Sequence, residues 1–135
     1  MEVMVETCCG IDVHQKSIVC CILDGPLDTN TPKKQHRTFG TTTKKLREAL
    51  TWIQSQNVTH VFFESTGQYW IPIFNIFYDS NLTLILANPQ HIKNLPGKKT
   101  DMNDAEWIAQ LGRCGLIHPS YIPCEEVQQL RLLTR

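Results

Sequence analysis

The start of the chain constrains the fold more than any other segment. Residues 6–23 are almost continuously apolar or β-branched, and the run is interrupted only at His14-Gln15-Lys16. Two apolar runs separated by a short polar turn are typical of a pair of strands. We therefore expect the domain to open with a β-hairpin, and residues 35–39, which precede Gly40, predict a third short strand.

Helices and strands alternate in the prediction after Gly40, because apolar residues recur first at helical and then at strand spacing. The threonines that follow Gly40 offer N-cap hydroxyls, Pro72 fits only the first turn of a helix, and Gly115 suits a helix C′ position. The expected elements are, in order, a helix that follows the threonines at 41–43 and extends to 56, a strand at 58–64, a helix at 68–78, a strand at 82–86 and a helix at 101–114. This order indicates an α/β domain.

The overall charge of the chain excludes some functions. The 135 residues include 13 Lys and Arg and 13 Asp and Glu, which gives a formal net charge of +0. A protein that coats nucleic acid needs a global positive charge, so any affinity for nucleic acid must come from local clusters. No apolar run reaches the roughly 18 to 20 residues that span a bilayer, and no signal peptide is recognisable. We expect a cytoplasmic protein without a membrane partner.

The length suits a single domain, which we expect to span 1–122. After Pro123, apolar residues recur with coiled-coil-like spacing, and the pattern stops at Arg135 before two heptads are complete. We therefore expect 123–135 to begin a linker or coiled-coil helix that leads to a further, C-terminal domain.

Six cysteines form no zinc-binding or disulfide pattern. They are Cys8-Cys9, Cys20-Cys21, Cys114 and Cys124, and no two of them have the Cys-x-x-Cys spacing. Adjacent residues of a strand point to opposite faces of its sheet, so each doublet places one thiol on each face. We expect reduced, structural thiols in a cytoplasmic protein.

Four carboxylates stand where such a fold would bring them together, namely Asp12, Glu64, Asp101 and Asp104. The first and fourth strands of a β-β-β-α-β sheet are commonly neighbours, which would place Asp12 beside Glu64. Asp101 and Asp104 are three residues apart at the start of a predicted helix, so both can face one site, and the helix N-terminus tolerates their charge.

Converging carboxylates repel one another unless divalent cations compensate their charge. Oxygen ligands without Cys or convergent His favour Mg²⁺ or Mn²⁺ over Zn²⁺. Two such ions about 3.5 to 4 Å apart would activate a nucleophile and stabilise the leaving oxygen in phosphodiester cleavage. The same acids also have ordinary interpretations as a helix cap, a solvated first-turn residue, a turn former and an exposed strand end. Spacing alone leaves this choice open.

Four short blocks of the sequence resemble, in order, those of the DEDD transposases of bacterial insertion sequences. They are Gly10-Ile11-Asp12-Val13-His14, Phe63-Glu64-Ser65-Thr66-Gly67, Asn88-Pro89-Gln90-His91 and Lys99-Thr100-Asp101-Met102-Asn103-Asp104-Ala105. This family is named after insertion sequence one-ten and includes the pilin-gene invertases. The resemblance covers almost the whole chain. It implies a ribonuclease H-like (RuvC-like) α/β fold with a mixed five-stranded sheet flanked by helices, in which the second strand is antiparallel.

The resemblance also assigns roles to single residues. Asp12 matches the first acid of the family's tetrad, Glu64 the second, Asp101 the third and Asp104 the fourth. It implies that these acids hold two Mg²⁺ or Mn²⁺ ions in a transposase that cuts and rejoins DNA. In the family, a second domain supplies an attacking serine, and a structured RNA from the same element pairs with the DNA. We therefore expect DNA and a guide RNA as partners, a homo-oligomer, and little or no activity of this chain alone.

Basic residues cluster in two segments despite the balanced total. The first cluster has no acid between Asp28 and Glu48, and the second immediately precedes Asp101. Such clusters bind nucleic-acid phosphates without regard to base sequence, although a solvated surface is the competing interpretation. The predicted nucleic-acid contacts are Lys33, Lys34, Arg37, Lys93, Lys98 and Lys99. His14 could touch a scissile phosphate, but we interpret it as a turn residue.

Two other functions fit parts of the pattern. An actin-like or sugar-kinase ATPase also begins with a hairpin that carries a Gly-Ile-Asp element, but it needs glycine-rich phosphate loops, which this chain lacks. A noncatalytic module that dimerises or binds nucleic acid would account for the C-terminal helical pattern. Such a module has no need for four converging acids, so these acids distinguish the two hypotheses.

Overall fold

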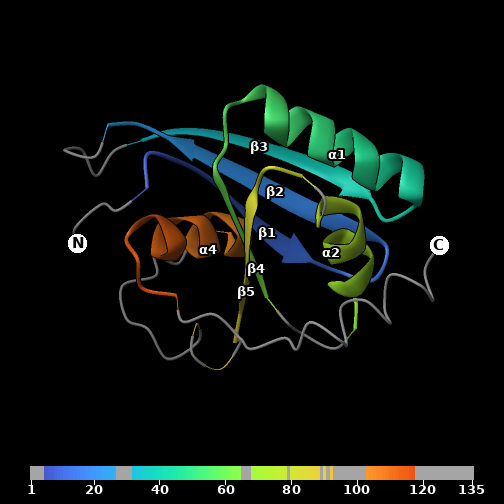
Figure 1. The fold of residues 1–135 in the computed structure, drawn as a ribbon. Coiled ribbons are helices and arrows are strands. Elements are labelled where there is room, and N and C mark those ends of the chain that lie inside the picture. The colour runs from blue at the N-terminus through green and yellow to red at the C-terminus, as the bar shows by residue number, and fades with distance from the viewer. Residues whose placement is uncertain are drawn as a thin grey trace.

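The computed structural model of the chain describes residues 5–26, 32–64, 68–78, 80–88, 90, 92 and 103–117. Its elements are β1 (Thr7–Val13), β2 (Ser17–Asp24), β3 (Lys33–Gly40), α1 (Thr43–Ser55), β4 (His60–Glu64), α2 (Ile71–Phe77), β5 (Thr83–Ala87) and α4 (Asp104–Arg113) (Figure 1). None of the helices formed by these residues is long and apolar enough to cross a membrane.

The five strands form one mixed sheet in the order β3-β2-β1-β4-β5. β2 runs antiparallel to both β1 and β3, whereas β4 runs parallel to β1 and to β5. The opening hairpin, the antiparallel second strand and the contact between the first and fourth strands are therefore confirmed. The α/β fold class, with helices on both sides of a five-stranded sheet, is confirmed as well.

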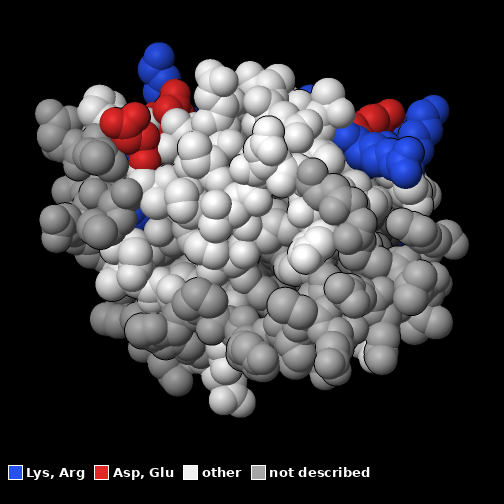
Figure 2. Space-filling view, in the orientation of Figure 1, with Lys and Arg blue, Asp and Glu red and all other residues white. Residues whose placement is uncertain are grey.

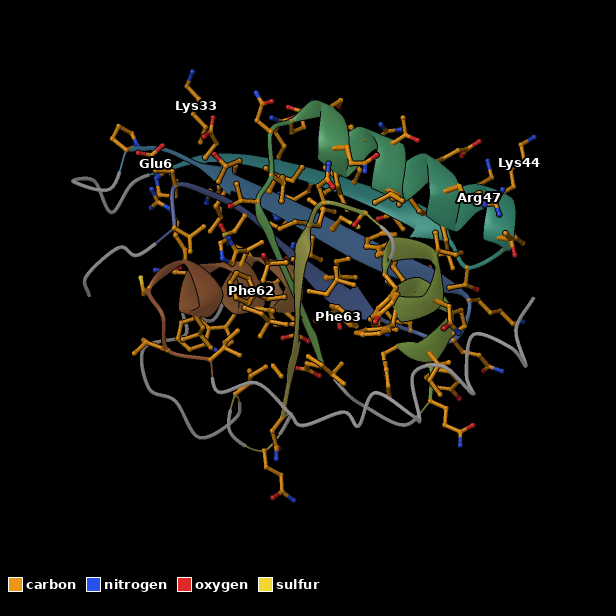
Figure 3. The ribbon with its side chains drawn as sticks, viewed as in Figure 1. Glu6, Lys33, Lys44, Arg47, Phe62 and Phe63 are labelled. Carbon is orange, nitrogen blue, oxygen red and sulfur yellow. The ribbon has the colours of Figure 1, made fainter. Side chains whose placement is uncertain are left out.

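The sheet has an apolar layer on each face. On one face, which we call the α1/α2 face, Cys9 and Ile11 of β1 pack with α1 and α2. On the other, the α4 face, Cys8 of β1 and Phe62 of β4 pack with α4. Phe62 and its neighbour Phe63 accordingly belong to different layers, and Figure 3 shows Phe62 directed towards α4. The strands are thus buried on both sides, as the continuous apolar runs of the sequence require.

Helix α1 forms where the sequence provides both a cap and an apolar stripe. The Thr42 hydroxyl accepts a hydrogen bond from the backbone N–H of Lys45 at 3.3 Å, which satisfies one of the free donors of the first turn. Leu46, Ala49 and Ile53 recur at helical spacing and are buried against the sheet. The predicted helix is confirmed: one of the three threonines caps it, and it ends one residue before the predicted Gln56.

Two other boundaries differ from the prediction. β3 extends from Lys33 to Gly40 because its backbone pairs with β2 over the whole length, although its side chains are exposed up to Thr38. Exposed polar residues give no apolar alternation, so the sequence predicted only 35–39. Helix α2 is shorter than the predicted 68–78, because Trp70 occupies the N-cap position without a side-chain capping bond, while Pro72 lies in the first turn as expected.

The cysteine doublets lie on opposite faces of the sheet, as the strand geometry predicts. Cys9 and Cys20 are in the layer under α1 and α2, and Cys8 and Cys21 are in the layer under α4. All four are buried and carry free thiols, as does the half-buried Cys114. Burial raises the pKa of Cys8 and of Cys21 from 9.0 to about 12. The sixth cysteine, Cys124, lies outside the described residues.

Candidate active site

Asp12 and Glu64 are neighbours at the end of two paired strands. The parallel pairing of β1 with β4 runs from Cys8 opposite His60 to Ile11 opposite Phe63. Asp12 and Glu64 are the next residue on each strand, and both are half-buried. Because residues at equivalent positions of parallel neighbours project from the same face, and because even-numbered residues of both strands face α4, these acids belong to the α4 face.

Helix α4 brings a third acid to the same end of the sheet. Gly10 lies under the start of α4, where a Cβ atom would be 2.5 Å from the backbone nitrogen of Ala109. The opposite end of the helix reaches the start of β1, since the N–H of Val5 donates to the carbonyl of Arg113 at 3.1 Å. α4 therefore runs antiparallel to β1, and its first residue, Asp104, lies at the end of the sheet that carries Asp12.

The start of α4 corrects one premise of the prediction. The helix begins at Asp104, and the side chain of Asn103 caps it by accepting a hydrogen bond from the N–H of Glu106 at 2.8 Å. Asp101 precedes the cap in the sequence and lies outside the described residues, so the predicted shared helix face of Asp101 and Asp104 has no basis in α4 as it begins here. Asp104 is exposed in the first turn, where the helix dipole favours a negative charge.

The structure thus brings three predicted acids to one end of one face without gathering their carboxylates. Among the described residues, no three His, Cys, Asp or Glu side chains lie close enough together to hold a metal ion.

His14 has a direct partner in this region. Its Nε2 atom lies 3.0 Å from Oδ2 of Asp12, and the His14 side chain is 56% exposed against 19% for Asp12. The backbone N–H of His14 also donates to the carbonyl of Ser17 across the β1–β2 turn, at 2.9 Å. His14 is thus a turn residue, as interpreted from the sequence, and its ring also orients the Asp12 carboxylate.

The predicted basic residues have different environments. Lys33 is exposed at the start of β3, whereas Nζ of Lys34 lies 2.6 Å from Oε1 of Glu106, whose side chain is only 11% exposed. Lys34 therefore contributes to the packing of α4 on the sheet, a role that the sequence pattern did not predict. The remaining predicted contacts, Lys93, Lys98 and Lys99, lie outside the described residues.

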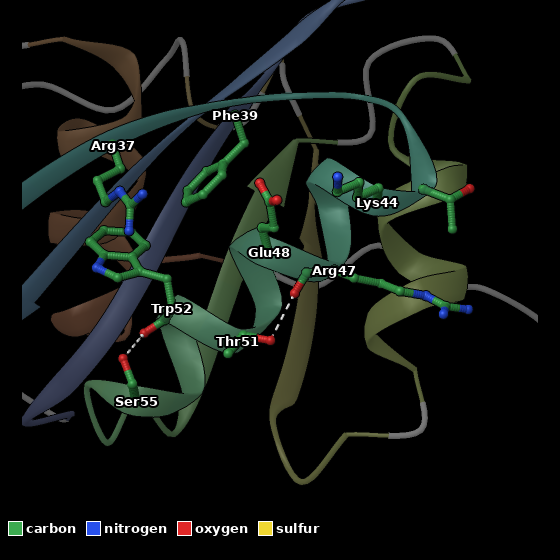
Figure 4. Close-up of a pocket in the computed structure, with 9 residues that line it drawn as sticks. Arg37, Phe39, Lys44, Arg47, Glu48, Thr51, Trp52 and Ser55 are labelled. Carbon is green, nitrogen blue, oxygen red and sulfur yellow. Dashed lines mark hydrogen bonds between the residues drawn. The ribbon is translucent and has the colours of Figure 1, made fainter.

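Arg37 lines an open groove between β3 and α1 (Figure 4). Its guanidinium carbon lies 4.9 Å from the centre of the Phe39 ring and 5.3 Å from that of Trp52. The groove has a volume of about 930 Å³, and Lys44 and Arg47 of α1 also line it. Sequence reasoning missed Trp52, because only the fold brings it to Arg37. The Arg37 and Phe39 pair was detectable, since residues two apart on a strand share a face.

The comparisons with known proteins agree with this architecture. A family model described as a transposase, of the DEDD type named after insertion sequence one-ten, matches residues 9–135. No curated protein sequence matches the chain.

Solved structures with the same fold include Holliday-junction resolvases. RuvC of T. thermophilus in complex with a Holliday junction substrate has a TM-score of 0.58 and 9% sequence identity, with 85% of this chain and 99% of that chain covered. A second Thermus thermophilus RuvC structure has a TM-score of 0.53 and 11% identity, with 93% and 89% covered. At these identities the likeness shows a RuvC-like, ribonuclease H-type fold.

Proposed function

The chain belongs to the DEDD transposase family named after insertion sequence one-ten, and from this premise we propose that it is the metal-dependent catalytic domain of a transposase that cleaves and rejoins DNA phosphodiesters. One observation carries the proposal. Asp12 and Glu64 follow the last paired residues of two adjacent parallel strands, and the first residue of α4, Asp104, lies at the same end of the same face. The known RuvC structure with a Holliday junction substrate supports DNA as the substrate class.

The donor set fits hard divalent cations. Asp12, Glu64 and Asp104, with Asp101 as the fourth acid of the family pattern, provide carboxylate oxygens, which Mg²⁺ and Mn²⁺ prefer. Two bound ions would supply Lewis-acid activation of the attacking and leaving oxygens of the phosphodiester. In this proposal the acids together form the metal site, while His14 holds the Asp12 carboxylate in a fixed orientation through the 3.0 Å contact.

The finer parts of the proposal concern the complete protein. We propose that residues 1–122 are the catalytic domain and that 123–135 begin the helix leading to a serine-bearing domain, so that the present chain alone does not recombine DNA. A guide RNA and a homo-oligomer belong to the same proposal. The same proposal includes the predicted nucleic-acid contacts at Lys33, Lys34, Arg37, Lys93, Lys98 and Lys99, since cations outside the metal site would hold phosphates along the bound nucleic acid.

Metal binding by the chain itself tests the site. In a calorimetric titration with Mn²⁺ at fixed pH and salt, the unmodified chain is expected to bind saturably, and Asp12→Asn/Asp104→Asn is expected to lose this binding. The matched control is Glu6→Gln. Glu6 is exposed and precedes the first residue of β1, at the opposite end of this strand from Asp12 (Figure 3), so its removal should leave the titration unchanged.

Recombination by the complete protein provides the second readout. Asp12→Asn is expected to lower it by at least about 10³-fold, with an unchanged circular dichroism spectrum, because the neutral amide cannot compensate a bound cation. Normal recombination by Asp12→Asn would overturn the assignment of the acids. An equal loss of Mn²⁺ binding in Glu6→Gln would show that the metal binds the surface without a defined site.

A further inference from the structure

The groove between β3 and α1 presents a flat cation to solvent. Arg37 is exposed, and its guanidinium is held over Phe39 and Trp52, whose ring centres lie 5.8 Å apart. Figure 4 shows the guanidinium next to the Trp52 indole at one end of the groove. An aromatic floor of this kind orients the guanidinium by cation–π attraction. Guanidinium planes and aromatic rings are the surfaces on which proteins stack unpaired bases.

The other end of the groove carries cations from helix α1. Lys44 and Arg47 line it together with Glu48, which is the single acid of the lining and lies 3.4 Å from Nζ of Lys45. Figures 2 and 3 show this charged corner above the amino-terminal end of α1, beside a largely uncharged surface. The groove therefore combines a stacking platform with a cationic margin. A single nucleic-acid strand requires both features, a π-face for the base and positive charge for the backbone.

The position of the groove relates it to the acids. Phe39 and Gly40 pair with Ile18 and Ser17 of β2, and Ile18 pairs in turn with Val13, the residue after Asp12. The cationic end of the groove is therefore at the same end of the sheet as the acids, on the opposite face and two strands away. A strand that passes around this end of the sheet can reach both sites.

We propose that this groove binds a single-stranded segment of the DNA substrate that flanks the cleaved phosphodiester, with a base stacked on Arg37 and phosphates at Lys44 and Arg47. The inference rests on the proposed function, which places the cleaved bond at the acids. A base inside a duplex is already stacked on its neighbours, so the platform selects unpaired DNA. The volume of about 930 Å³ leaves room for at least one nucleotide.

Binding of a labelled oligodeoxynucleotide of about 12 nucleotides by the 135-residue chain tests the proposal, with fluorescence anisotropy measured over a series of salt concentrations. Arg47→Gln is expected to weaken binding at least about fivefold and to lower the salt slope by about 0.7, the value for one lost phosphate contact on a single strand. Arg37→Lys retains the charge but loses the plane. It should weaken binding about threefold or more, at an unchanged salt slope.

The control variant is Lys45→Gln, which removes the same charge from the same turn of α1 at a residue outside the groove lining. Because Lys45 pairs with Glu48 of the lining, Lys45→Gln and Arg47→Gln are compared in a Glu48→Gln background. Lys45→Gln is expected to change the affinity less than about twofold, because salt screens a surface charge that makes no direct contact with the DNA. Equal losses in Lys45→Gln and Arg47→Gln, or an unchanged affinity in Arg37→Lys, would overturn the proposal in favour of a nonspecific basic surface. A duplex of the same sequence that binds as tightly as the single strand would overturn it too.

Two further measurements distinguish this proposal from RNA binding and from the proposed metal site. RNA of the same sequence should bind no more tightly than DNA, and a preference for RNA of tenfold or more would overturn the assignment to DNA. Asp12→Asn/Asp104→Asn should retain the groove-dependent binding, because the acids lie on the opposite face. If the acids fail the Mn²⁺ test while the groove variants still behave as expected, the proposed catalysis is wrong and the single-strand site stands on its own.

Discussion

The two faces of the sheet are covered in different ways. On the α1/α2 face, ordinary apolar side chains such as Leu46 and Ile53 fill the space between helix and sheet. On the α4 face, the helix backbone itself contacts the sheet, because Gly10 below it and Gly112 within it have no side chain to separate the layers. The α4 face also buries charge, since Glu106 and Arg113 are 8% and 2% exposed.

This difference indicates a division of labour. A helix that contacts a strand through its backbone has little freedom to shift, because interiors are packed like crystals and any displacement creates a clash or a void. Asp104 is therefore fixed relative to Asp12 by the packing of α4. None of the three described acids, Asp12, Glu64 and Asp104, lies on the α1/α2 face, and the surface of that face leaves an open groove beside β3.

The largest expected effect comes from filling the backbone contact under α4. Gly10→Ala would place a Cβ atom against the backbone of Ala105 and Ala109, which cannot move aside as a flexible side chain can. We expect a loss of about 3 kcal/mol or more in the free energy of unfolding, measured by urea denaturation. The matched control is Gly40→Ala beside α1, where the new atom would meet only the flexible Lys45 side chain, at 3.4 Å from its Cγ and 3.7 Å from its Cβ. If the two variants have equal stability, the contrast between the faces is wrong.

Alkaline pH tests whether both faces exclude water equally. Burial raises the pKa of Cys8 and of Cys21 to about 12, against 9.0 in the unfolded chain. Between these values the unfolded chain loses protons that the folded chain retains, so stability is constant below about pH 9 and falls as the pH rises towards 12. From pH 7 to pH 10, we expect a loss of about 1.4 kcal/mol for each such thiol.

Single cysteine variants assign this loss to a face. Cys21→Ala removes one thiol from the α4 face and Cys9→Ala removes one from the α1/α2 face, where burial also raises the pKa well above its ordinary value. Each substitution is expected to reduce the loss of unfolding free energy between pH 7 and pH 10 by about the contribution of one thiol. Urea denaturation at the two pH values measures this loss. An undiminished loss in Cys21→Ala would show that folding does not raise the pKa of this thiol.

The smallest expected effect compares two ion pairs. Lys34 and Glu106 approach to 2.6 Å at the α4 face with one partner nearly buried, whereas Lys45 and Glu48 approach to 3.4 Å on the exposed side of α1. Double-mutant cycles with Lys→Met and Glu→Gln changes should give a coupling of about 1 kcal/mol for the first pair and about 0.3 kcal/mol for the second. Equal couplings would mean that water screens both pairs alike.

Much of the site could be predicted from the sequence, because it depends on local patterns and on simple strand topology. The hairpin placed Asp12 near the end of the first strand, and the contact of the first with the fourth strand placed Glu64 beside it. The start of α4 was predicted three residues too early, although a signal was present. Asn103 followed by Glu106 is a cap with the capping-box spacing, and it competes with the earlier Asp101.

Other features could not be predicted, since they arise only when distant segments meet. Arg37 and Trp52 belong to different elements, so nothing near either residue indicates the groove. Lys34 fits a basic surface cluster in the sequence, yet the fold places it beside a buried acid of α4. Gly112 was the partial exception, because a lone glycine inside a helix is costly and indicates a packing requirement.

The edge position of β3 has a consequence for solubility. Among the described residues, its backbone pairs only with β2, and an eight-residue edge strand is a template on which a second molecule can add a strand. Lys33 and Arg37, together with Lys34, whose charge Glu106 partly compensates, give this strand a positive charge that repels an identical strand. The cations that we propose as nucleic-acid contacts therefore also oppose aggregation. A variant that neutralises all three is expected to precipitate by intermolecular β-sheet formation before its affinity for DNA can be measured.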